Sequence, residues 1–295
     1  MAGIVYGSIS GAVLAVAALG FNLQFGVTNY ANFAYGPMLT IGAFAAFVFD
    51  VNPLHFGFWP SEVLAVLVTG VISLGIGQYL FTPFFRRRPQ LLFGLTVTFA
   101  TALILDSVLL AVWGSYTREI SYPNGALTVH NVGFLRLTTL DLAVVGVACV
   151  VLVGVHVLLT RTRLGRQMRA LSDNESLATA CGLSVSRILA VTWAGTGVLA
   201  GIAGLSEQLM VRSFDPTMGD QIFYLLVAAV IFGGIGRPLG AVAGAMVVGI
   251  VSQVSVVFVG EAYSTVSIFV VLLGVMLLRP NGLLGARVKS VFASA

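Results

Sequence analysis

The most regular feature of the chain is a series of long apolar segments separated by short polar ones. A helix needs about 20 mostly apolar residues to cross a bilayer. Nine segments approach that length: 4–25, 30–49, 61–85, 91–113, 141–160, 186–209, 222–236, 239–259 and 264–278. The seventh is short and interrupted by glycine, so it is either a full crossing or a re-entrant or broken helix. The pattern predicts an all-α polytopic membrane protein with eight or nine transmembrane helices in one domain, 1–295.

Composition excludes a soluble fold. Hydrophobic residues make up 58% of the chain and charged residues 9%, whereas soluble domains carry about 25% charged residues. The 34 glycines are typical of transmembrane helices that pack closely. The GxxxxGK[ST] phosphate loop is missing from the sequence, so the chain has no recognisable nucleotide-binding motif of its own.

Basic residues gather in three clusters after the third, fifth and last apolar segments. These clusters are Arg86–Arg88; Arg161, Arg163, Arg166 and Arg169; and Arg279, Arg287 and Lys289. Positive residues mark cytoplasmic loops, and an even number of spans separates the clusters. The N-terminus is therefore expected outside and the C-terminus in the cytoplasm. The net charge is +4. Because the arginines lie in short clusters between apolar segments, they indicate membrane topology rather than nucleic-acid binding. The polar segment 114–140 then becomes an extracytoplasmic loop, and 161–185 the longest cytoplasmic loop.

An uncharged polar segment, 26–37, separates the first two spans. It holds Asn29, Asn32, Phe33, Tyr35 and Gly36. Irregular backbone at membrane depth is tolerated only inside the protein or along a wet cavity. The segment is therefore interpreted as a break that lines a translocation path, with a short interfacial loop as the alternative.

The cytoplasmic loop carries signals of a short helix. Ser172 or Asp173 is a candidate N-cap, with Glu175 at capping-box spacing from Ser172, and Gly182 is a candidate C-cap. A capped helix outside the membrane is typical of a docking element for a partner; the alternative is a helix lying on lipid headgroups. The side chains expected to meet the partner are Leu177, Ala178 and Cys181.

A glycine-dense stretch, 233–244, provides a second candidate break, again as part of the path. Its glycines at the expected interruption are Gly233, Gly234 and Gly236. Corresponding interruptions in two halves of a chain point to a transporter's path. Gly240 and Gly244 also form a GxxxG pattern, so close helix packing is an equally supported interpretation.

Asp106 and Glu207 are the main acids inside predicted spans. Intramembrane acids are often functional, but no partnered chain of acids, histidines or lysines accompanies them, so the sequence gives little support for proton coupling. Asp106 is interpreted as a structural hydrogen-bond partner or a substrate contact. The sequence shows no metal-ligand spacing and no catalytic constellation, so neither a cofactor nor an enzymatic activity is expected.

At these segments the chain resembles the permease subunits of branched-chain amino-acid ABC importers, in particular the shorter of two paralogous permeases. Residues 18–36 are similar to the family's N-terminal signature, although Tyr35 stands where the family usually has histidine. Residues 161–183 resemble its cytoplasmic coupling loop, with Arg169-Ala170 and Leu177-Ala178 in the expected places. Residues 228–241 and 280–285 resemble its third signature and its closing pattern.

The resemblance implies a complex in the cell inner membrane. It contains a second permease, two cytoplasmic ATPases and an extracytoplasmic substrate-binding protein. ATP hydrolysis on the partner chains would act through the segment 172–182. Family members carry branched-chain amino acids, urea, short amides and other amino acids. The alternative function is a secondary transporter or channel that acts alone on a small polar solute.

Overall fold

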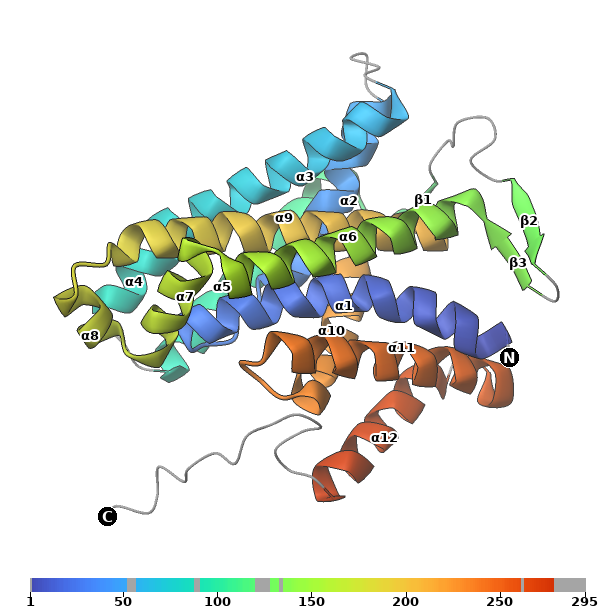
Figure 1. Cartoon of the computed structure of the whole chain (residues 1–295). Coiled ribbons are helices and arrows are strands. Elements are labelled where there is room, and N and C mark those ends of the chain that lie inside the picture. The colour runs from blue at the N-terminus through green and yellow to red at the C-terminus, as the bar shows by residue number, and fades with distance from the viewer. Residues whose placement is uncertain are drawn as a thin grey trace.

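The computed structural model describes residues 2–51, 57–87, 91–119, 128–132, 135–260 and 263–278. It is a bundle of helices with two very small sheets (Figure 1). Each of the nine predicted spans contains a helix in the structure. Six helices in the described part are long and apolar enough to cross a membrane, and three apolar helices are shorter. The basic cluster at 279–289, Arg88 and the closing pattern at 280–285 lie outside the described residues.

The first half of the bundle runs from α1 to α6. Its elements are α1 (Ala2–Thr28), α2 (Tyr35–Val51), α3 (Phe58–Gly75), the π-helix η1 (Ile76–Phe81), α4 (Thr82–Arg87), α5 (Leu91–Trp113), β1 (Arg118–Glu119), β2 (Val129–Val132), β3 (Leu135–Thr138) and α6 (Thr139–Arg161).

The second half runs from α7 to α12. Its elements are α7 (Arg163–Asp173), α8 (Glu175–Ala180), α9 (Val185–Val211), β4 (Ser213–Phe214), α10 (Met218–Gly233), α11 (Pro238–Val259) and α12 (Ser264–Leu278).

The two ends of the bundle differ in their secondary structure (Figure 1). One end carries α7 and α8, and we call it the helical end. The other carries β2 paired with β3 and β1 paired with β4, both antiparallel, and we call it the strand end. Between them, α1 and α9 form the buried centre, where α1 packs on α11 and α9 packs on α3. The helices α5 and α6 lie at the periphery.

The chain contains an internal repeat with a spacing of 183 residues. Helix α1 and helix α9 each have 27 residues, and each is followed by six non-helical or extended residues and a short apolar helix, α2 or α10. The two non-glycine residues with positive φ among those described, Asn29 and Arg212, occupy equivalent places. Because α1 ends at the helical end and α9 at the strand end, the repeats are inverted (Figure 1). Inverted repeats with discontinuous helices are typical of transporters.

Small residues bring α1 and α11 together. A Cβ atom built on Gly7 would lie 2.6 Å from Ile250 Cα, and one on Gly249 would overlap the backbone of Gly11. Backbone on both sides leaves nothing that yields to a larger side chain, so this contact depends on glycine.

We expect Gly249→Leu to destabilise the bundle by about 3 kcal/mol or more, because α1 and α11 must separate to accept the side chain. Thermal unfolding of the detergent-solubilised protein, followed by size-exclusion chromatography, measures the effect. Gly274→Leu on α12 is the matched control, since a Cβ there meets nothing within 4 Å. Equal thermal stability of the two variants would contradict the packing described.

Candidate functional site

The first break in the repeat, residues 29–34, has a fixed non-helical structure. Asn29 adopts φ 58°, directly after the end of α1. The side-chain oxygen of Asn32 accepts a hydrogen bond from the Ala34 amide at 3.1 Å, and its amide group donates to Gln24 Oε1 at 3.2 Å. Asn32 is buried, whereas Asn29 is exposed. The predicted break in the helical structure between the first two spans is therefore confirmed.

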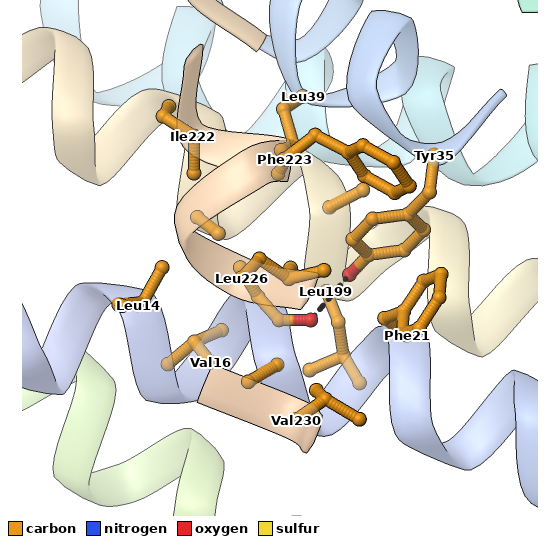
Figure 2. Packing of buried hydrophobic residues seen from close by; sticks show 14 of the residues in the cluster. Leu14, Val16, Phe21, Tyr35, Leu39, Leu199, Ile222, Phe223, Leu226 and Val230 are labelled. Carbon is orange, nitrogen blue, oxygen red and sulfur yellow. Dashed lines mark hydrogen bonds between the residues drawn. The ribbon is translucent and has the colours of Figure 1, made fainter. Parts of the chain in front are cut away.

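The first residue of α2, Tyr35, is a core residue. Its ring is 2% exposed, and its hydroxyl donates to the carbonyl of Ala17 at 3.1 Å, in the interior of α1. Figure 2 shows this bond and the ring beside Phe21 and Phe223. Gly20 leaves the room that the ring fills. Tyr35 therefore anchors the start of α2 against the interior of α1.

The sequence pattern did not predict the second break, residues 212–217. These residues fall between the sixth and seventh predicted spans. Arg212 adopts φ 66°, and Asp215 Oδ1 accepts a hydrogen bond from the Thr217 amide at 2.7 Å, as Asn32 does with Ala34 in the first break. The run Asp215-Pro216-Thr217 before Gly219 is a turn signal that marks it. The counterpart of the first break is thus 212–217.

The predicted break near 233–240 is a turn between α10 and α11. Gly233 and Gly240 pack backbone to backbone, and Gly234 and Gly236 take positive φ values that favour glycine. The amide of Gly236 donates to Asn22 Oδ1 at 2.7 Å. Close helix packing, the alternative interpretation, describes this segment.

The two short helices begin side by side. The Gly219 amide of α10 donates to Thr40 Oγ1 of α2 at 2.9 Å, and Gly219 and Gly36 pack without room for a Cβ between them. A Cβ on Gly36 would lie 3.0 Å from Asp220 Oδ1. The Asp220 carboxylate therefore lies beside the first turn of α2, within the length of the bundle.

One face of α5 runs along the first break and along α2. Phe99, Asp106 and Trp113 are spaced by seven residues, which puts them on one side of the helix. The ring of Phe99 lies 5.8 Å from that of Phe33 in the first break, and Trp113 lies 4.9 Å from Phe44 of α2. We call this face of α5, with the residues it meets, the α5 track.

The middle of the α5 track is acidic. Asp106 and Asp220 are close enough for their charges to act on each other, both are half-buried, and Asp106 Oδ1 has no hydrogen-bond partner among the described residues. A carboxylate at membrane depth is costly unless it meets water, a partner or a ligand. The interpretation of Asp106 as a structural hydrogen-bond partner is therefore not supported by any bond in the described part of the chain. Glu207 lies near the end of α9, away from these acids.

Asp220 was missed in the sequence because it stands two residues before a predicted span, where an acid looks interfacial. Only the adjoining break, which starts α10 beside Gly36, shows that it is internal. Of the residues predicted to line a path, Phe33 and Gly36 lie at the α5 track. The core contains Asn32 and Tyr35, which are buried. The turn between α10 and α11 contains Gly234 and Gly236, directly after Gly233 at the end of α10.

The helical end contains two helices where the sequence predicted one. Ser172 and Asp173 are the last residues of α7, so neither is the N-cap, and Glu175 does not form a capping box with Ser172. Asn174 caps α8, because its side-chain oxygen accepts from the Leu177 amide at 2.9 Å. Asn174 serves this purpose because Asn is as strong a cap as Ser or Asp.

The predicted C-cap is confirmed. Gly182 follows α8 with φ 81°, and the amides of Gly182 and Leu183 donate to the carbonyls of Thr179 and Ala178. This left-handed glycine closes the helix.

Exposure divides the predicted docking residues of α7 and α8. Leu177 is 62% exposed, but Ala178 is buried, so the prediction that Ala178 meets a partner is wrong: helical periodicity turns it toward the protein's own core. The other exposed residues are Arg169, Ala170, Asp173, Glu175, Cys181 and Gly182. These residues and Leu177 belong to α7, α8 and the turn after α8, at the helical end (Figure 1), and we call this exposed set the docking surface.

Ser172 links this surface to the first break. Its hydroxyl donates to the carbonyl of Gly26 in the last turn of α1, three residues before Asn29. Met168 and Leu171 of α7 are buried in the same core cluster as Val27. Helix α7 is therefore in direct contact with the end of α1, where the first break begins.

Comparisons with known proteins identify the family of the chain. Residues 3–279 match the family described as the permease component of the branched-chain amino acid transport system. The chain is 29% identical to a probable branched-chain amino acid transport permease protein LivH of Methanocaldococcus jannaschii, over 95% of this chain and 90% of the relative.

Two bacterial relatives are similar over comparable lengths. The high-affinity branched-chain amino acid transport system permease LivH of Escherichia coli K12 is 24% identical, over 93% of this chain and 92% of its own. BraD of Pseudomonas aeruginosa is 24% identical, over 96% and 94%. No solved structure matches. Because the family match covers nearly the whole chain, this multi-pass membrane protein belongs to the permease components of branched-chain amino acid ABC transport systems.

Proposed function

We propose that this chain forms one side of the translocation path of an importer for branched-chain or related amino acids and amides. It works with a second permease, two ATPases on the cytoplasmic side and an extracytoplasmic substrate-binding protein. The observation that carries the proposal is the α5 track. Two acids, Asp106 and Asp220, act on each other electrostatically near the starts of the short helices that follow the two breaks, and both are partly exposed in the single chain. A second permease completes the α5 track.

The orientation follows from charge. The helical end carries the cluster Arg161, Arg163, Arg166 and Arg169, which the positive-inside rule assigns to the cytoplasm. The strand end, with the segment 114–140, is then extracytoplasmic, the N-terminus of α1 lies outside, and the C-terminus lies in the cytoplasm.

Coupling runs through α7 and α8. The ATPase binds the surface around Leu177, and its movement reaches the first break through α7 and the bond from Ser172 to Gly26. A transporter acting alone would have no use for an exposed, doubly capped helix beyond the membrane, and this favours the ABC importer over the alternative.

The experiment is co-purification of the ATPase with the tagged permease pair. Gly182→Arg is expected to lose the ATPase, because a bulky charge enters the docking surface and the left-handed conformation disfavours it. Gly182→Asn is the matched control, because asparagine tolerates this conformation, and it should retain the ATPase. Normal co-purification and uptake by Gly182→Arg would refute the docking role of α8.

A further inference from the structure

The second break is tied to the segment 114–140 at both ends of that segment. Strand β4, which lies in the break, pairs with β1, so that Phe214 faces Arg118 and Ser213 faces Glu119. At the other end, the Arg212 guanidinium reaches Thr138 Oγ1 at 3.5 Å, directly before α6. The break is thus held by the loop rather than by the neighbouring spans alone.

Phe214 seals the strand end of the α5 track. It is 2% exposed, and its ring lies 4.9 Å from Phe44 and 5.7 Å from Phe47. Trp113, the last residue of the track, packs on the same Phe44. A path that follows α5 has to displace this aromatic group to open at the strand end.

Arg118 fastens the seal from the loop side. Its guanidinium lies 5.9 Å from the centre of the Phe47 ring, a distance at which cation and ring attract each other. Its Nη2 donates to the carbonyl of Trp113 at 3.4 Å. Strand β1 therefore contacts the aromatic group directly as well as through its pairing with β4.

A buried amide side chain, that of Gln208, lowers the stability of the state in which Phe214 is packed, which we call the closed state. Gln208 is fully buried, and neither its side-chain oxygen nor its nitrogen has a partner in the described part of the chain. It stands one turn before Arg212, whose amide bonds to its carbonyl. An unsatisfied buried amide costs free energy, so the closed state is less stable than its packing alone would make it.

We propose that residues 212–217 are the extracytoplasmic gate of the path and that β1, with Arg118, is its latch. Binding of the extracytoplasmic substrate-binding protein beside β1 separates β1 from β4 and lets Phe214 leave its position among the aromatic rings, while Gln208 gains partners as the gate opens. This inference rests on the proposed function, which supplies the partner and the orientation.

The test locks the latch with a disulfide. Glu119→Cys with Ser213→Cys places two thiols on facing residues, whose Cβ atoms lie close enough in antiparallel pairs for a bridge. The variant complex, in proteoliposomes with the binding protein, is oxidised with copper phenanthroline, and closure is measured by mass spectrometry. ATP-driven leucine uptake should fall in proportion to the bridged fraction and return with dithiothreitol.

Two controls isolate the latch. Asn131→Cys with Arg136→Cys bridges facing residues of the β2–β3 hairpin and should leave uptake unchanged, and the wild-type chain with the oxidant accounts for Cys149 and Cys181. Uptake at the wild-type rate by fully bridged protein would overturn the latch. The reduced protein tests the importer function itself, so failure of one is distinguishable from failure of the other.

A second variant tests the gate without a disulfide or an oxidant. Gln208→Leu removes the unsatisfied amide and keeps the volume, so the closed state gains stability. We expect about ten-fold slower uptake together with a higher unfolding temperature. Unchanged uptake by a folded Gln208→Leu protein would contradict the opposing role of this residue.

Discussion

Leu177→Asp is expected to abolish ATP-driven uptake while the chain still inserts and assembles with its permease partner. Leu177 is an exposed apolar side chain in the middle of α8, 62% accessible, and it is not part of the main hydrophobic core. Central apolar anchors of interfaces contribute about 2 kcal/mol or more, which corresponds to roughly thirty-fold weaker binding, and a charge in the partner's groove adds a desolvation cost.

The measurement combines ATPase co-purification with uptake in proteoliposomes. Leu177→Met keeps an apolar side chain of similar volume and should retain both. Ala178→Asp should behave differently from either, because Ala178 is buried and its loss destabilises the chain itself. The docking surface is wrongly placed if Leu177→Asp retains uptake within two-fold of the wild type.

Asp106→Asn and Asp220→Asn are each expected to lower the specificity constant for uptake by about ten- to a hundred-fold. The amide keeps the size of the side chain but removes the charge. A charge-assisted hydrogen bond contributes about 1.5–3 kcal/mol, and a zwitterionic amino acid presents an ammonium group to such acids. The binding protein still docks and the ATPase still turns over, so the loss should appear in transport alone.

Asp50→Asn is the matched control for these two variants. Asp50 also lies near a second acid, Glu62, but at the far end of α2, away from the α5 track. It should transport normally. The track is not the substrate's route if Asp106→Asn and Asp220→Asn both transport like Asp50→Asn.

The sequence predicted the parts of the fold that depend on local pattern. Local apolar pattern determines such helices, so each of the nine predicted segments contains one, and six of those in the described part of the chain are long enough to cross a membrane. Gly182 was recognised as a C-cap because the left-handed position it fills selects glycine. The polar run around Asn32 was recognised as a break because uncharged polar residues are unusual between two spans.

The parts that depend on contacts across the bundle were missed or wrong. Ser172 has the composition of an N-cap, but its hydroxyl bonds to Gly26, which is 146 residues away, and Asn174 caps α8. The second break was missed because Pro216 and Asp215 look like an ordinary loop between spans. Its depth follows only from the packing of Gly219 on Gly36. The electrostatic influence of Asp220 on Asp106 likewise depends on helices that are distant in the sequence.

The central claim is that this chain forms a translocation path but hydrolyses no ATP itself. A separate cytoplasmic ATPase drives it through α7 and α8. This claim is tested most directly by measuring labelled leucine in sealed proteoliposomes that contain the permease pair and the binding protein, with and without the ATPase. We predict accumulation above the external concentration only when the ATPase and ATP are both present. Accumulation against the gradient by the permeases without the ATPase would contradict the account.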